Sequence, residues 1–249
     1  MFSSQETDIA SGGGGSFPTT HWSSVVSAGG GAEPNAQAAL ESLCQAYWYP
    51  LYSYVRRQGR SVEEAQDLTQ EFFARLLQKE YLRHPDPTRG RFRTFLLTAL
   101  KRFLINDWKK GRAARRGDGQ PAISCDQLEM ETRFLAEAVD PSTPENAFEK
   151  RWAVTVLEQV LKRLREEFIA GGKAERFERL KVLLWGEKGS PPYSEVAAEL
   201  GLSEGALKVV VHRMRKRYRE LLRVEVAHTV ERPEEVDDEL RHLIAVVSG

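Results

Sequence analysis

The residue types that perform catalysis or bind metals occur in this sequence without the spacing that either chemistry requires. None of the histidines and cysteines forms a His-x-x-x-His or paired-cysteine motif; they are His21, His84, His212, His228, His242, Cys44 and Cys125. No serine or cysteine lies in a nucleophile motif, and no glycine-rich phosphate loop is present. We therefore expect no catalytic residue, metal, cofactor or disulfide, and a protein that is not an enzyme.

The charged residues are segregated along the chain. Lysine plus arginine and aspartate plus glutamate both number 36, so only the distribution of charge is informative. Between Arg89 and Arg116 nearly every charge is positive, with Asp107 the exception. Basic side chains bind phosphates, and aromatic rings between them can receive an unstacked base. This segment is therefore predicted to bind nucleic acid, with basic residues that include Arg91, Arg93, Lys101, Arg102 and Lys109 and rings that include Phe92, Phe95, Phe103 and Trp108.

A second basic surface is predicted between Tyr193 and Arg223. Apolar residues recur there at helical spacing in two blocks, a short one and a longer one. Gly201 can adopt the left-handed conformation that ends the first helix, and Ser203 can accept an N-cap hydrogen bond for the second. Two amphipathic helices joined by so short a turn predict a helix-turn-helix.

The longer of these helices is predicted to enter a DNA major groove. A wheel of about 100° per residue with Leu207 toward the core places small, apolar and basic residues on the opposite side. A basic face opposite a core face is typical of a recognition helix. The residues expected to contact DNA are Ser203, Lys208, Val209, His212, Arg213, Arg215 and Lys216.

An acidic helix is predicted before the basic segment. Ser61 and Glu64 make a capping box, and the apolar residues that follow keep helical spacing. On the polar side, Asp67 and Glu71 form an acidic i,i+4 pair that repels itself by a few tenths of a kcal/mol. A basic partner surface would turn that cost into a gain. Thr69 is placed on the same polar side.

These patterns together predict an all-α protein of two helical domains joined by an acidic linker, the C-terminal one a helix-turn-helix, winged-helix-like DNA-binding domain. Pro50 predicts a kink or a break in the first long helix. The expected segments are a flexible N-terminal extension (1–34), a first helical domain (35–116), the linker (117–144), the second domain (145–223) and an acidic C-terminal helical extension (224–249).

Length and hydropathy limit the setting of the protein. A chain of 249 residues has room for two modest domains with real cores. No signal peptide is recognisable, and no apolar run approaches the ~20 residues that span a bilayer. We expect a reduced, cytoplasmic, soluble monomer without membrane contact.

Two motifs and the helix-turn-helix together resemble a bacterial RNA polymerase sigma factor of the extracytoplasmic-function (ECF) group of the sigma-70 family. Residues 67–73 (DLTQEFF) match the acidic Asp-Leu-x-Gln-Glu-x-Phe segment that binds the polymerase clamp in that family. Residues 86–96 (DPTRGRFRTFL) match the motif leading into the helix that melts the promoter. The resemblance covers about residues 35–223. The recognition helix departs from the family, because Val209 stands within a run that is usually Lys-Ser-Arg and can touch only a thymine methyl.

The resemblance implies a role for each predicted surface. Core RNA polymerase and promoter DNA are the implied partners. Polymerase contacts fall to Glu64, Asp67, Gln70 and Glu71, and the upstream (−35) element to the recognition-helix residues given above. The downstream (−10) element is assigned to Asp86, Arg89, Arg91, Phe92, Arg93, Phe95, Lys101, Arg102, Asn106 and Lys109.

Several alternatives remain at this stage. A stand-alone helix-turn-helix regulator would need only the second domain, usually as a dimer on a palindrome. A Ser/Thr kinase and an anti-sigma factor are further candidate partners, the kinase because phosphorylation of Thr69 would add negative charge to the acidic motif. The C-terminal helix either packs on the second domain or covers the basic recognition face as an acidic brake.

Overall fold

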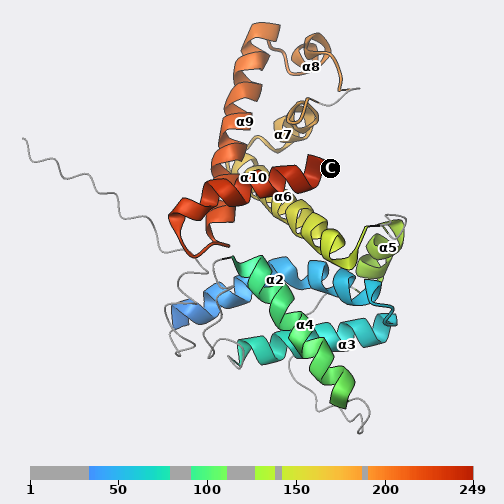
Figure 1. Ribbon diagram of the computed structural model, residues 1–249. Helices are drawn as coiled ribbons and strands as arrows, with labels where there is room; N and C mark the ends of the chain where they lie inside the picture. Colours follow the sequence, from blue (N-terminus) through green and yellow to red (C-terminus); the bar gives the residue numbers. More distant parts are fainter. Residues whose placement is uncertain (1–33, 79–90, 111–126, 138–141, 187–189, 249) are drawn as a thin grey trace, which may run out of the picture.

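The computed structural model describes residues 34–78, 91–110, 127–137, 142–186 and 190–248. Nearly all of these residues are helical and no β-strand occurs among them, so the all-α prediction is confirmed for the described chain. Figure 1 shows an N-terminal group of helices below, a C-terminal group above and a long diagonal helix, α6, between them. The main helices are α2 (Pro34–Arg57), α3 (Val62–Leu77), α4 (Phe92–Lys110), α5 (Gln127–Glu137), α6 (Pro144–Ala170), α7 (Ala174–Leu180), α8 (Tyr193–Glu199), α9 (Glu204–Ala227) and α10 (Val236–Ser248).

Aromatic rings form the core of the N-terminal group. Trp48 of α2 stacks on Phe73 of α3 with ring centroids 5.3 Å apart, and Phe72 lies 5.8 Å from Phe103 of α4. These side chains are buried, and rings at such distances add to the apolar burial that holds three helices together. Of the kink or break predicted at Pro50, the break is absent, since α2 continues through this residue to Arg57.

The acidic segment between the two groups is less irregular than predicted. It contains α5, which packs against the C-terminal half of α2: Met130 and Phe134 are buried, and the Arg56 guanidinium lies 4.7 Å from the Phe134 ring centroid. Tyr52 donates a hydrogen bond to Glu131 at 2.6 Å. These contacts join residues far apart in the sequence, so local composition could not reveal them.

Helix α6 belongs to both groups. Its first turns, with Phe148 and Trp152 fully buried, pack on α2, whereas its later turns carry Val160 and Leu164 into the core of the C-terminal group. The buried apolar residues consequently form one continuous cluster rather than two. Thr143 caps the helix by accepting a hydrogen bond from Asn146 N at 3.2 Å.

The turn between α8 and α9 has the geometry that the sequence predicts. Gly201 has a φ of +62°, which favours glycine, and Ser203 Oγ accepts a hydrogen bond from Ala206 N at 3.2 Å. Helix α9 is longer than predicted, since it continues past Arg223 to Ala227. After it, the 3₁₀ turn η2 (Pro233–Glu235) leads into α10, which lies across the base of α9 and against α6 (Figure 1).

Candidate nucleic-acid and protein interfaces

The acidic face of α3 lies toward solvent. Asp67 and Glu71 are exposed, as predicted, and Glu71 forms an ion pair with Arg75 on the next turn. Glu64 is partly committed to the helix start, because its Oε2 accepts a hydrogen bond from Ser61 N at 3.4 Å. Gln70 is partly buried. Asp67 and Glu71 are therefore the carboxylates of this set that a partner can reach most readily.

The placement of Thr69 on the polar side of α3 is wrong. Its side chain is fully buried, and its hydroxyl donates a hydrogen bond to Ala65 O at 2.7 Å. At about 100° per residue, Thr69 lies only 40° from Ala65 and so shares the core face, which the helical wheel could have revealed. A kinase cannot reach this hydroxyl in the described fold.

Two rings predicted to bind DNA are instead part of the core. Phe92 and Phe95 are 0% and 2% exposed, and the Phe92 ring meets Tyr47 edge-on at a centroid distance of 5.0 Å. Their prediction as base-contacting residues is therefore wrong for this conformation. Aromatic residues beside basic ones could not be divided between core and surface from spacing alone.

The two arginines at the start of α4 are likewise occupied. Arg93 is 5% exposed; its Nε lies 2.6 Å from Glu239 Oε1, and its Nη1 donates to both oxygens of Glu149 at 2.6 Å. Burial opposes the charged guanidinium, but the hydrogen bond to Glu239 and the nearby carboxylates outweigh it and raise the pKa of Arg93. Arg91 Nε lies 3.3 Å from Glu239 Oε2. The prediction that Arg93 contacts DNA is therefore wrong for this conformation, and Arg91 is engaged in the same cluster.

The remaining residues predicted for the −10 element differ in accessibility. Lys101 Nζ lies 2.8 Å from Glu145 Oε1 and lowers the pKa of that carboxyl. Arg102 and Asn106 are exposed on α4. Asp86, Arg89 and the side chain of Lys109 lie outside the described residues.

The basic face of α9 is open to solvent. Val209, His212, Arg213 and Lys216 are exposed, as the helical wheel predicts. Lys208 is also exposed and pairs with Glu204 at 2.6 Å, one turn earlier on the same helix. This face therefore presents several basic side chains around Val209.

Arg215 was predicted to contact DNA and instead holds the C-terminal group together. Its Nε donates to Leu184 O at 3.0 Å and its Nη2 to Leu183 O at 2.6 Å. These carbonyls end the 3₁₀ turn η1 (Lys181–Leu183), whose last C=O groups have no helical partner. The hydroxyl of Ser203 is similarly engaged as the N-cap.

Four glutamates with structural roles were not singled out in the sequence. Glu131 accepts from Tyr52 and Arg56, and Glu145 accepts from Tyr54 at 3.3 Å and pairs with Lys101. Glu149 and Glu239 bind Arg93. Each of these glutamates contacts a residue at least 44 positions away in the chain, so no local sequence motif marks it. The only available signal was Glu239 itself, a charge within the apolar stripe of α10.

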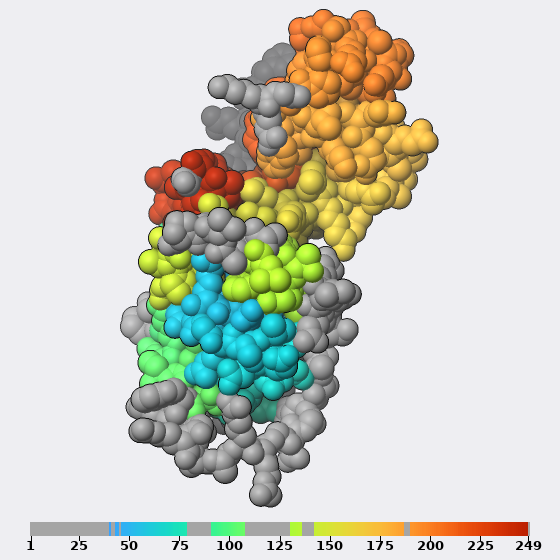
Figure 2. Space-filling model, turned by 90° about the vertical axis from the view of Figure 1, so that its right-hand side faces the viewer, coloured from blue at the N-terminus to red at the C-terminus, as the bar shows by residue number. Residues whose placement is uncertain are grey.

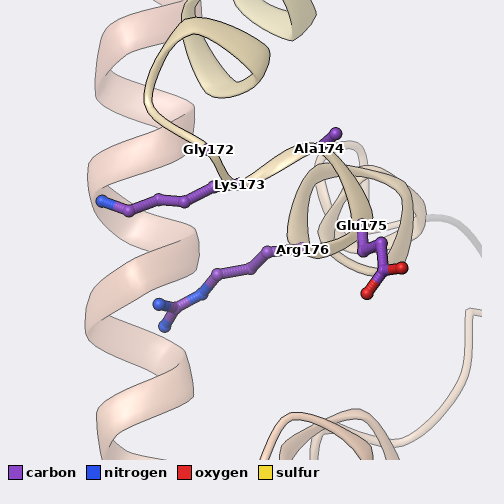
Figure 3. Close-up of a pocket in the computed structure, with 5 residues that line it drawn as sticks. All are labelled: Gly172, Lys173, Ala174, Glu175 and Arg176. Carbon is purple, nitrogen blue, oxygen red and sulfur yellow. The ribbon is translucent and has the colours of Figure 1, made fainter.

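Neither a pocket nor a cluster of possible metal ligands adds a further candidate binding site among the residues that the structure describes. The hollow in Figure 3 is lined by five consecutive residues, Gly172–Arg176, at the start of α7, and Glu175 points away from the side chains of Lys173 and Arg176. No group of three or more His, Cys, Asp or Glu is placed to hold a metal ion in the described ranges. In the same ranges, no helix has both the length and the apolar character needed to cross a bilayer.

The exposed carboxylates of α3 and the exposed Arg102 and Asn106 of α4 give the N-terminal group candidate surfaces for a protein partner and for nucleic acid. Residues 43–114, which include most of α2 and all of α3 and α4, match the family model of sigma-70 region 2. The match supports a sigma factor of the sigma-70 family, and region 2 implies RNA polymerase binding and promoter melting. Searches of curated proteins and of solved structures found no match.

Proposed function

We propose that the protein is an ECF-type sigma factor without an active site of its own, which binds core RNA polymerase and directs it to promoters with two separated elements. The observation that carries this proposal is the region 2 match over α2–α4, on which the exposed pair Asp67 and Glu71 coincides with the acidic segment expected to dock on polymerase. Opposite charge on the polymerase would steer docking and fix its orientation.

Helix α9 is proposed to read the −35 element. Its exposed side chains Lys208, His212, Arg213 and Lys216 are suited to phosphates and base edges, and Val209 to a thymine methyl. Helix α4 and the segment before it are proposed to capture an unstacked base of the −10 element, which costs a few kcal/mol that contacts to the single strand must offset. Arg102 and Asn106 are accessible for this role in the described conformation.

The docking proposal is tested by reversing charge on α3. Asp67→Lys combined with Glu71→Lys should abolish assembly with core RNA polymerase in a pull-down and transcription in vitro, because both exposed carboxylates become cations. Glu63→Lys is the matched control, since Glu63 is also exposed on α3 but lies outside the motif. Unchanged affinity of the double variant for core polymerase would refute the docking surface. A wild-type chain that ignores core polymerase but binds a palindromic duplex as a dimer would instead favour a stand-alone helix-turn-helix regulator.

A further inference from the structure

An ionic cluster joins the C-terminal helix to the start of α4. Glu239 of α10 is fully buried, and a buried carboxylate is costly unless it is paired and hydrogen-bonded. Arg93 supplies that pairing through Nε at 2.6 Å and Nη2 at 3.2 Å, and Arg91 Nε lies 3.3 Å away. On the other side of Arg93, Glu149 of α6 accepts from Nη1 and lies 2.9 Å from His242 Nε2 of α10. We call these five residues the clasp.

The backbone reinforces the clasp. Phe92 N donates to Thr229 O at 2.9 Å, and Arg91 forms an antiparallel bridge with Val230, which is fully buried. The segment between α9 and α10 therefore lies directly against the beginning of α4. In Figure 1, α10 accordingly lies between the C-terminal helices and the N-terminal group, and Figure 2 shows it at the junction of the two groups from another side.

The clasp covers residues that are proposed to bind the −10 element. Residues 91–95 belong to the segment proposed for the −10 element, yet Arg93 is bound by two carboxylates and the Phe92 ring is in the core. A phosphate could reach Arg93 only by displacing Glu149 and Glu239. Lys101 is also paired with Glu145 of α6. By contrast, the acidic pair on α3 and the basic face of α9 remain exposed.

The spacing of the two DNA elements leads to the same conclusion. Sites centred at −35 and −10 are about 25 base pairs apart, or roughly 85 Å at ~3.4 Å per base pair of duplex. The N-terminal end of α9, where the residues proposed to read DNA begin, is separated from Thr229 by little more than the length of this 24-residue helix, roughly 36 Å at ~1.5 Å per residue. Because Thr229 touches Phe92, the start of α4 and the N-terminal end of α9 are too close to contact both DNA elements at once.

We propose that the described conformation is an autoinhibited form, in which the C-terminal extension covers the part of the −10-binding surface at the start of α4 until docking on core polymerase allows the two helical groups to separate. This inference rests on the proposed function, because the covered surface is the one assigned to promoter melting. The exposed α3 face can bind polymerase in the closed form, so docking can precede opening. The extension thus acts as a brake on the start of α4. It is not a brake on the recognition face of α9, because the residues of that face remain exposed.

A disulfide across the clasp provides the decisive experiment. Bridge partners in antiparallel pairing have Cα atoms about 4.5–5.5 Å apart, within the range that a disulfide spans. Arg91→Cys with Val230→Cys, in a chain whose two native cysteines are replaced by alanine, should therefore close when oxidised. The oxidised full-length chain should still bind core polymerase but transcribe at least about tenfold less than the reduced form of the same variant, from a promoter recovered with the wild-type chain. The comparison is made within one variant because Arg91→Cys itself removes a predicted −10 contact. The reduced form of the same variant is the matched control.

A second variant tests the brake without a cross-link. Glu239→Gln leaves Arg93 with one carboxylate and should shift the closed–open equilibrium toward the open form, so that apparent affinity of the polymerase complex for the promoter rises by roughly tenfold. Asp238→Asn is the control, since Asp238 is exposed on the same helix and pairs with Arg241 of that helix. Equal transcription by the oxidised and reduced cysteine variants, together with unchanged promoter affinity of Glu239→Gln, would overturn the brake. If the wild-type and reduced chains fail to bind core polymerase, the proposed function itself is wrong, and the brake with it.

Discussion

At the scale of single residues, the position of a side chain is decided either by its neighbours in the chain or by helices far away in the sequence. The cap at Ser203 and the exposed face around Val209 follow from the sequence within one or two helical turns, and the structure confirms both. The positions of Arg93 and Phe92 do not follow from nearby sequence, because their partners Glu239 and Tyr47 lie far away in the chain. A basic residue beside a ring has the same local pattern whether it faces DNA or a buried carboxylate.

Substitution of Thr69 should affect stability strongly when it introduces charge. Thr69→Asp would bury a carboxylate with no cationic partner placed by the described contacts, so we expect a loss of about 3 kcal/mol or more in the free energy of unfolding. Thr69→Val keeps the shape and should cost about 1 kcal/mol or less. Urea denaturation measures both variants, with Asp67→Asn as the exposed control on the same helix. Equal stability of the Thr69→Asp variant and the wild type would show that Thr69 faces solvent.

Arg215 and Lys216 are neighbours with opposite expected roles. Arg215→Met removes two donors from buried carbonyls and should lower unfolding free energy by about 1–3 kcal/mol. Lys216→Met should leave stability within about 0.5 kcal/mol, because the side chain is exposed. In DNA binding measured over a series of salt concentrations, Lys216→Met should reduce the slope of log K against log salt by about 1. The reverse pattern would mean that α9 is rotated relative to the described structure.

At the scale of elements, helices that carry their own signals were predictable and α5 was not. Helix α3 has a complete capping box and a regular apolar stripe, and both are present in the structure. Helix α5 lies in a segment whose acidic, irregular composition indicated a linker. Its order comes from Tyr52, Arg56 and Tyr49 of α2, the last contacted by Arg133 at 4.4 Å from the ring centroid. Tertiary contacts of this kind override weak local preference.

Acid should loosen α5 through Glu131. The hydrogen bond from Arg56 lowers the pKa of Glu131 against the opposing effect of its burial. Because the pKa is lower in the folded protein, the contribution to stability is complete above the ordinary carboxyl pKa of about 4.3 and is lost as pH falls through the folded value. The stability difference between the wild type and Glu131→Gln, from urea midpoints, should therefore shrink between pH 6 and about pH 3. A difference that stays constant over this interval would show that Glu131 is not ion-paired.

At the scale of the whole molecule, the two groups of helices share one core through α6. The sequence predicted two domains from composition and from the positions of proline and glycine, but it could not reveal that the first turns of α6 pack on α2. Tyr54 illustrates the contact: burial, followed by the charge of Glu145 on α6, raises its pKa to about 12. In the proposed open form, separation of the groups must therefore expose apolar surface as well as break the clasp, and the proposed binding to polymerase and DNA would have to supply that free energy.

A shared core predicts that the closed protein unfolds as one unit. Variants that keep only Trp48 or only Trp185 report on the N-terminal and C-terminal groups respectively, and their urea transitions followed by fluorescence should coincide. Leu164→Ala should cost about 2–5 kcal/mol, because this α6 side chain is fully buried in the C-terminal group. That loss should lower the midpoint reported by Trp48 as much as the midpoint reported by Trp185, even though Trp48 belongs to the other group. Two separate midpoints, with only the Trp185 transition moved by Leu164→Ala, would mean that the groups fold independently and that contact between them adds little to stability.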